Sequence, residues 1–225
     1  DIGNTTTREV RARIGNSPSP TGYDYRQSSP VVAEGQVYVG SADGNVYALA
    51  ADSGRIIWTF KTGERVRATP TVDNGTVYIG SWDKSFYALR AATGQMRWKT
   101  PLSGQVQTTA LVADGVVYCA SRKASVVALD AQTGQITWEY SYGSNMWVES
   151  SPRLHNGIVY IGSSGSQMIV GLHSQTGEIF TGFFSSGLYY WSTPAVVGDT
   201  LYIGATGLQE EGGLYAFRLA DGKFT

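Results

Sequence analysis

Apolar and polar residues alternate along short stretches of the chain, and the same pattern returns five times. Each copy opens with a Ser-Pro, Thr-Pro or Thr-Ala pair, runs through a few apolar residues to a turn, and continues into a strand centred on a tyrosine. These marker tyrosines stand 40 or 42 residues apart, at Tyr38, Tyr78, Tyr118, Tyr160 and Tyr202. Five copies at this period indicate a repeat architecture.

Each copy contains the patterns of four short strands. In the first copy the second strand alternates around Tyr38, the third covers residues 46–49 and the fourth covers residues 56–60. The Asn74-Gly75 and Asn156-Gly157 pairs fall between first and second strands, where a tight hairpin requires residues that tolerate positive φ. No stretch of the repeat follows a helical period. The pattern predicts an all-β fold of four-stranded antiparallel units of about 40 residues, the size of a β-propeller blade.

Small and large residues recur at fixed places in the first three copies. A small residue in the third strand suits close packing between neighbouring blades, and a tryptophan in the fourth strand offers a flat apolar cover. The positions are Ala48, Ala88 and Ala128 for the first, and Trp58, Trp98 and Trp138 for the second. We interpret both sets as structural.

Composition narrows the classes of function. Of the 225 residues 42% are hydrophobic and 16% are charged, which is apolar enough for a core. The net charge of -1 gives no sign of a nucleic-acid partner. One cysteine excludes an intrachain disulfide, and one cysteine with two histidines excludes a Cys/His zinc cluster. No apolar run is long enough to span a membrane, and no Ser/His/Asp spacing or phosphate-binding loop is present.

The turn between the third and fourth strands resembles a known motif. The stretches 48–58, 88–98 and 128–138 are similar to the tryptophan-docking motif of the pyrroloquinoline-quinone (PQQ)-like propeller family, the third most closely. The fourth copy keeps the turn but has Thr181 at the tryptophan position, and the fifth ends before that position. The resemblance covers roughly residues 28–225.

The resemblance implies one of two functions. The quinoprotein dehydrogenases of the family are eight-bladed enzymes that hold the quinone with calcium on the propeller axis, often beside a disulfide between adjacent cysteines. Cys119 stands alone, so that disulfide cannot form. Non-enzymatic relatives include the outer-membrane assembly lipoprotein and sensor domains of bacterial Ser/Thr kinases. We therefore expect a non-catalytic binding scaffold without a cofactor, and a PQQ-dependent dehydrogenase-like enzyme, or a fragment of one, is the alternative.

The resemblance, together with a first residue, Asp1, that is not methionine, also implies an extracytoplasmic location, whether periplasmic, cell-surface or secreted.

The repeats divide the chain into an N-terminal segment and five units. Residues 1–27 precede the first copy, and within them residues 8–14 alternate as a strand does, so we predict that they form the closing strand of the last blade. The repeats span residues 28–67, 68–107, 108–149, 150–191 and 192–225. Two architectures fit: a closed five-bladed ring, or part of a ring of seven or eight blades.

One position of each repeat supplies a candidate site. It lies three residues before the second residue of the Ser-Pro, Thr-Pro or Thr-Ala pair. Propellers usually bind ligands at the mouth of the axial channel, where the loops entering the innermost strands converge. That position is polar or aromatic in every copy: Gln27, Arg67, Gln107, Glu149 and Trp191. Such a set would form a ligand pocket, although solvated strand starts also need polar residues.

Two aromatic-rich connections, residues 143–147 and 187–191, add Trp147, Tyr189 and Tyr190 to this set. Clustered exposed aromatic side chains suit sugar or peptide binding, and they would equally suit plugging a wide channel. The sequence therefore predicts a protein partner or a small ligand, possibly a glycan, at the axial face.

Overall fold

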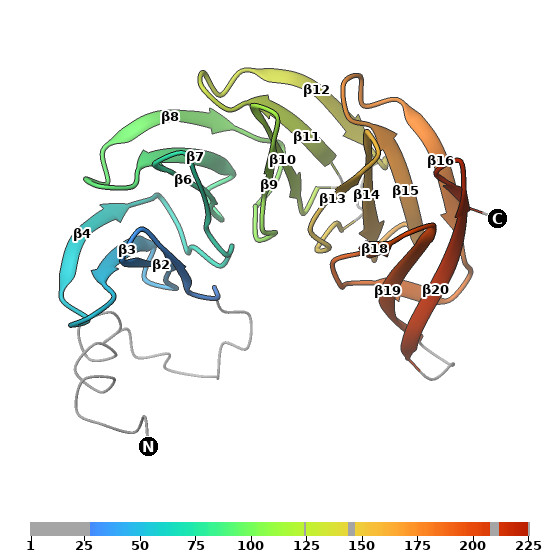
Figure 1. Ribbon diagram of the computed structural model, residues 1–225, viewed down its shortest axis with the longest axis horizontal. Helices are drawn as coiled ribbons and strands as arrows, with labels where there is room; N and C mark the ends of the chain where they lie inside the picture. The colour runs from blue at the N-terminus through green and yellow to red at the C-terminus, as the bar shows by residue number, and fades with distance from the viewer. Residues whose placement is uncertain (1–27, 124, 144–146, 208–211, 225) are drawn as a thin grey trace. The chain divides into compact units, whose positions relative to one another are not determined.

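The computed structural model describes residues 28–123, 125–143, 147–207 and 212–224, and every regular element in these ranges is a β-strand (Figure 1). The predicted strand at residues 8–14 and the candidate residue Gln27 lie outside the described residues. No helix in the described ranges could cross a membrane. The chain forms two compact units, Asp1–Gln107 and Thr108–Thr225.

The first unit contains two four-stranded antiparallel sheets in which each strand pairs with the next along the chain, in the orders β1-β2-β3-β4 and β5-β6-β7-β8. The first blade consists of β1 (Val31–Ala33), β2 (Gln36–Gly40), β3 (Asn45–Ala50) and β4 (Ile56–Lys61). The second blade consists of β5 (Thr71–Asp73), β6 (Thr76–Gly80), β7 (Ser85–Arg90) and β8 (Met96–Pro101).

The second unit repeats this pattern twice and then varies it. The third blade consists of β9 (Leu111–Ala113), β10 (Val116–Ser121), β11 (Ser125–Asp130) and β12 (Ile136–Ser141). The fourth consists of β13 (Arg153–His155), β14 (Ile158–Ser163), β15 (Met168–His173) and β16 (Ile179–Phe184). The fifth sheet contains β17 (Leu188–Tyr190), β18 (Ala195–Val197), β19 (Thr200–Gly207), β20 (Gly213–Ala220) and β21 (Lys223–Phe224). The predicted all-β fold of four-stranded propeller blades is confirmed.

The hairpins between first and second strands have the predicted backbone. Asn74 and Gly75 have φ of 45° and 67°, and Asn156 and Gly157 have φ of 48° and 75°. Two consecutive residues with positive φ match the right-handed twist of the flanking strands, which is why Asn-Gly pairs recur there. The turn residues therefore determine where each hairpin folds.

One β-bulge recurs at the same repeat position in four blades. The register between third and fourth strands shifts after Ala48, Ala88, Ala128 and Gly171. In the first three blades each alanine pairs directly with the fourth-strand tryptophan, and in the fourth blade Gly171 pairs with Thr181. The fourth blade thus differs from the first three at both members of this pair: glycine replaces the alanine, and threonine replaces the tryptophan.

The first four marker tyrosines and the three fourth-strand tryptophans are buried. Tyr38 and Trp58 pack with neighbouring apolar residues in the first unit, and Tyr118 and Trp138 do so in the second. Cys119 is fully buried in the second unit, and burial raises the pKa of its thiol. It is an inert core residue, because the reactive form is the thiolate.

The fifth sheet differs from the sequence-based expectation. We predicted a loop at residues 187–191, but β17 pairs with the second half of β19, at Tyr190↔Ala205, whereas β18 pairs with the first half, at Ala195↔Tyr202. The reason is the length of β19, whose edge extends beyond β18 and offers unpaired backbone groups. The sequence alone does not predict the pairing of β17 with β19, because that pairing depends on which backbone groups of β19 are left without a partner by β18.

Candidate functional site

Within each unit, the chain segments that enter the innermost strands lie side by side in neighbouring blades. In the second unit the Ser150 hydroxyl donates to the Ser192 carbonyl at 2.8 Å, and the Thr109 amide donates to the Ser151 hydroxyl at 2.9 Å. In the first unit the Ser29 amide donates to the Thr69 hydroxyl at 3.1 Å. In the second unit the predicted candidate residues Glu149 and Trp191, which directly precede Ser150 and Ser192, therefore stand at the same end of adjacent blades.

In the first unit, Arg67 lies against an aromatic side chain of the second blade. Its guanidinium carbon is 3.9 Å from the centroid of the Trp82 ring, a cation–π contact. Gln107, the last residue of this unit, is half-buried.

In the second unit, Glu149 and Trp147 are joined by an arginine that our sequence analysis did not select. The Glu149 carboxylate is 3.5 Å from Arg122 Nε, and the two side chains are only 8% and 15% exposed. The Arg122 guanidinium carbon lies 4.5 Å from the centroid of the Trp147 ring, and Trp147 is 47% exposed. A mostly buried ion pair thus supports an exposed indole.

The backbone of Trp147 is also held in place. Its carbonyl accepts hydrogen bonds from the hydroxyls of Ser163 and Ser164, both at 3.1 Å, and from the Ser164 amide at 3.1 Å. These donors belong to the last residue of β14 and to the turn that follows it. The ring is therefore fixed from the backbone side as well as from the arginine side.

The second exposed indole of this unit is Trp191. It is 38% exposed, its Nε1 donates to the Thr206 hydroxyl at 2.9 Å, and its ring centroid is 6.4 Å from that of the half-buried Tyr189. Tyr190 is completely buried, and its hydroxyl is 2.7 Å from the Ser185 hydroxyl. Tyr190 therefore belongs to the core of the fifth sheet and offers no surface to a ligand.

The missed contact residues have a sequence signal in common. Trp82, Arg122 and Thr206 each stand four residues after a marker tyrosine. Alignment of the repeats marks that position, but the contacted strand entry precedes Trp82 and Thr206 in sequence and follows Arg122.

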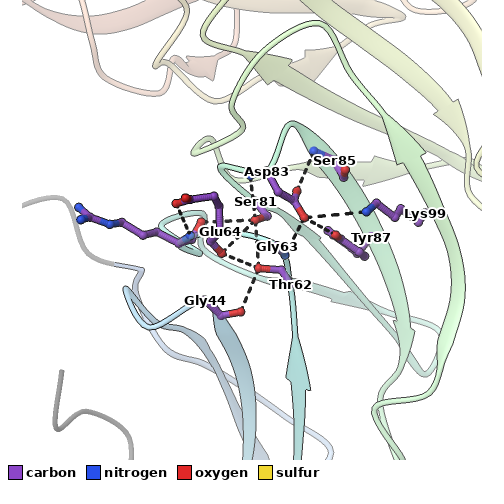
Figure 2. Close-up of polar contacts among 10 residues, drawn as sticks. Gly44, Thr62, Gly63, Glu64, Ser81, Asp83, Ser85, Tyr87 and Lys99 are labelled. Atoms are coloured by element: carbon purple, nitrogen blue, oxygen red, sulfur yellow. Dashed lines mark hydrogen bonds and ion pairs between the residues drawn. The ribbon is translucent and has the colours of Figure 1, made fainter.

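A polar network in the first unit serves structure rather than binding (Figure 2). The Thr62 hydroxyl lies within hydrogen-bond distance of the Gly44 and Glu64 carbonyls and of the Ser81 hydroxyl, at 2.6–3.1 Å. The Asp83 carboxylate accepts hydrogen bonds from the Gly63 amide at 2.9 Å and from the Tyr87 hydroxyl. These contacts join the loop after β4 to the turn after β6.

The first blade repeats the carboxylate–tyrosine part of the network. The Tyr47 hydroxyl donates to Asp43 at 2.7 Å. Burial raises the pKa of Asp43, but hydrogen bonds from Tyr47 and Asn45 outweigh it, so that the net pKa is lowered. Burial and the Asp43 contact raise the pKa of Tyr47 to about 12. Both groups keep their ordinary charge states at neutral pH, so we assign them a bracing role.

The repeated blades define a class, the β-propeller proteins built from PQQ-like repeats. The chain belongs to the family described as outer membrane protein assembly factor BamB, whose model matches residues 11–90 and 42–181. The two matched stretches overlap, as expected when repeats align in more than one register. No curated protein sequence is significantly similar to the chain.

Two solved structures resemble the chain. BamB from Moraxella catarrhalis has a TM-score of 0.74 at 21% identity, and the match covers 91% of this chain and 64% of that one. The computationally designed Ika8 protein has a TM-score of 0.71 at 15% identity, and the match covers 84% of this chain and 57% of that one. The chain thus spans less than two thirds of either length, and at these identities the likeness concerns the fold.

Proposed function

We propose that this protein is a non-catalytic scaffold that binds a protein partner through the blade end carrying the strand entries. The observation that carries the proposal is the pair of partly exposed, firmly held indoles in the second unit. Trp147 and Trp191 precede the adjacent segments joined by the Ser150–Ser192 hydrogen bond. Arg122, Glu149 and Tyr189 support them. We call these five residues the indole surface.

The physical properties of the indole surface suit a protein interface. Tryptophan, tyrosine and arginine dominate the binding energy of interfaces. The two aromatic side chains bury large areas at a low cost in conformational entropy. Contacts from Arg122 and Thr206 restrict the two indole rings before binding, which lowers the entropic cost of association. Glu149 offsets the charge of Arg122, so that the arginine can remain beside the ring when water is excluded.

The family description suggests the kind of partner. A model described as an outer membrane protein assembly factor makes another component of that assembly process the first candidate. We accordingly propose an extracytoplasmic location. In the first unit, Arg67 on Trp82 offers the same pairing of cation and indole, and Gln107 stands at the equivalent strand entry, so both are proposed as secondary contacts. Gln27 keeps its predicted role by sequence position alone.

The experiment compares binding by the wild type and by Trp147→Ala/Trp191→Ala. Peptides from extracytoplasmic assembly proteins and a glycan panel are screened, and the dissociation constant of each ligand that binds is then measured. We expect peptide binding, weakened at least tenfold (about 1.4 kcal/mol) in the double variant. Phe184→Ala is the matched control, since Phe184 is a 64% exposed aromatic residue on β16 of the same unit.

Two outcomes would contradict the proposal. Unchanged peptide affinity in a folded double variant would place the site elsewhere, and glycan binding alone would replace the protein partner by a sugar. A separate assay addresses the enzymatic alternative: the protein is incubated with PQQ, Ca²⁺, alcohols or sugars, and an artificial electron acceptor. We expect no turnover, and robust turnover would overturn the non-catalytic assignment.

A further inference from the structure

A tryptophan side chain fills the contact between the first and second blades, and another fills the contact between the third and fourth. Between the first two blades, Trp58 Nε1 donates to the Ala91 carbonyl at 2.7 Å, and a Cβ built on Gly94 would be 2.7 Å from the ring. We call such a contact a seam. The ring of one blade thus packs flat against the β7–β8 turn of the next, and only glycine at position 94 leaves room for it.

The seam between the third and fourth blades has the same construction. Trp138 Nε1 donates to the Ser174 carbonyl at 2.8 Å, and a Cβ on Gly177 would be 2.5 Å from the ring. Each tryptophan seam therefore uses two positions of the following blade: a carbonyl that accepts from the indole, and a glycine three residues later that faces the ring.

The seam between the fourth and fifth blades lacks its tryptophan. Thr181 stands at that position, and Gly222 is the counterpart of Gly94 and Gly177. A Cβ on Gly222 would be 3.2 Å from both the Phe180 ring and the Tyr160 hydroxyl. The Tyr160 hydroxyl donates to the Gly222 carbonyl at 2.6 Å. Phenylalanine and tyrosine thus replace only part of what an indole provides.

A cavity of about 1040 Å³ lies at this seam. Its fifth-blade wall includes Leu219 and Gly222, which correspond to the carbonyl position and the glycine of the tryptophan seams. Phe180 contributes an aromatic ring to the fourth-blade wall, and His173 packs edge-on against that ring with the centroids 4.9 Å apart. The cavity is large enough for a small organic ligand.

Charged groups surround the ring-binding part of the cavity. Glu178, Asp199 and Asp221 line it together with one arginine, Arg218. Carboxylates accept hydrogen bonds from N–H donors, and the majority of acids favours a ligand that carries a positive charge. Lys223 Nζ lies 5.2 Å from the centroid of the Phe180 ring, so two basic side chains stand against the three carboxylates.

We propose that this cavity binds a planar aromatic ring bearing N–H donors, of the indole-amine class, in the seam that lacks a tryptophan. The ring packs beside Phe180, which itself covers Gly222, and the amine points toward the carboxylates. The same chemistry is available from a free amine or from an N-terminal tryptophan of a peptide. The cavity is formed by the turns at the opposite strand ends from the indole surface, so this site is independent of the proposed function.

The test uses the full chain, tryptamine as the probe, and titration followed by amide NMR. We expect saturable binding, with shift changes centred on Leu219 and Gly222. Indole-3-acetate has the same ring but a negative charge, and it should bind at least tenfold more weakly. A Trp-Gly-Gly peptide distinguishes the sources: tighter binding than tryptamine indicates a peptide terminus, and weaker binding indicates a free amine.

A double variant, Phe180→Thr/Thr181→Trp, copies the Thr137-Trp138 pair of the third blade into the fourth. It should place a tryptophan in the seam, weaken tryptamine binding at least tenfold and raise the melting temperature. Arg97→Trp adds an exposed tryptophan to the second blade and should leave binding unchanged. Absence of saturable binding at millimolar tryptamine would overturn the proposal. So would shift changes away from the seam, even if the double variant does not fold.

Discussion

The second unit contains two seams, which are the contacts between consecutive blades, and different side chains fill them. Between the third and fourth blades, Trp138 covers Gly177 and also donates to the Ser174 carbonyl. Between the fourth and fifth, Phe180 covers Gly222, and Tyr160 supplies the donor to the Gly222 carbonyl. The apolar cover and the hydrogen-bond donor are therefore separable functions, which one side chain combines at the first seam and two share at the second.

The seam between the fourth and fifth blades, where two side chains replace one tryptophan, has a cavity beside it. An indole is larger than a phenyl ring, and the pair opposite each other in the sheet changes from Ala128 and Trp138 to Gly171 and Thr181. A Cβ built on Gly171 would be 2.8 Å from the Thr181 side chain and 2.9 Å from that of Ile158, so these side chains fill the space at the pair itself. The cavity lies beside Phe180 instead, and neither Gly171 nor Thr181 lines it.

The largest effect should come from removing the ring that performs both functions. Trp138→Ala leaves a void and removes the donor to Ser174, and we expect a loss of about 3–5 kcal/mol of unfolding free energy. Phe180→Ala, at the seam that already has a cavity, should cost roughly 1–2 kcal/mol, because the half-buried ring removes less area from water. Urea denaturation measures both values. Equal losses would show that the two seams are equally packed.

Substitution of the glycines that face the aromatic rings tests the same seams. Gly177 has φ of 72° and a Cβ there would lie 2.5 Å from Trp138, so Gly177→Ala adds a clash to backbone strain. We expect a loss of roughly 2–4 kcal/mol. Gly157 has φ of 75° with no atom within 4 Å, so Gly157→Ala should cost only the backbone term, roughly 1–2 kcal/mol.

Gly222→Ala should fall between these two, because its neighbours would be 3.2 Å away. Thermal unfolding of the three variants gives the order. If Gly157→Ala proves as harmful as Gly177→Ala, ring contact at the seam does not explain the glycine.

The smallest effect concerns the tyrosine hydroxyls. The Tyr160 hydroxyl donates to Gly222 at 2.6 Å, whereas the Tyr118 hydroxyl is 3.3 Å from the Ser174 carbonyl, which already accepts from Trp138. Tyr160→Phe should therefore cost about 1 kcal/mol, and Tyr118→Phe less than that. Urea denaturation at pH 7 compares the two variants, and equal losses would contradict the assignment of Tyr160 as the donor at its seam.

The contribution of Tyr160 to the free energy of unfolding should depend on pH. Burial raises the pKa of Tyr160 above 10.0 in the folded protein. The unfolded chain thus loses this proton first as the pH rises, and ionisation favours unfolding above about pH 10. Removing the hydroxyl should make that part of the fall in stability shallower, as measured by urea denaturation between pH 9 and 11. An unchanged slope would show that Tyr160 does not contribute.

The blades could be predicted because their signals are local. Asn74 and Gly75 specify a tight hairpin by their own backbone preferences, and alternation around Tyr38 specifies a strand with one covered face. Five repetitions of such signals were enough to predict the all-β propeller fold and to assign the tryptophans to packing. The family match agrees with that reading of the chain.

The candidate site was predictable in part. The strand-entry position selected Arg67, Glu149 and Trp191 from repeat alignment alone. Arg122 was missed because it is 27 residues from Glu149 in sequence and contacts it only when neighbouring blades pack. Tyr190 was selected as a surface aromatic, but the pairing of β17 with β19 buries it.

The repeat, the strands, the hairpins and the residue types at each strand entry can be predicted from the amino-acid sequence, because turn chemistry and alternation act over a few neighbouring residues. What each side chain faces depends on the tertiary structure. Trp138 and Ser174 are 36 residues apart, and Tyr160 and Gly222 are 62 apart. Contacts at that separation depend on how one blade packs on the next, and the seam that lacks a tryptophan is the one beside the cavity.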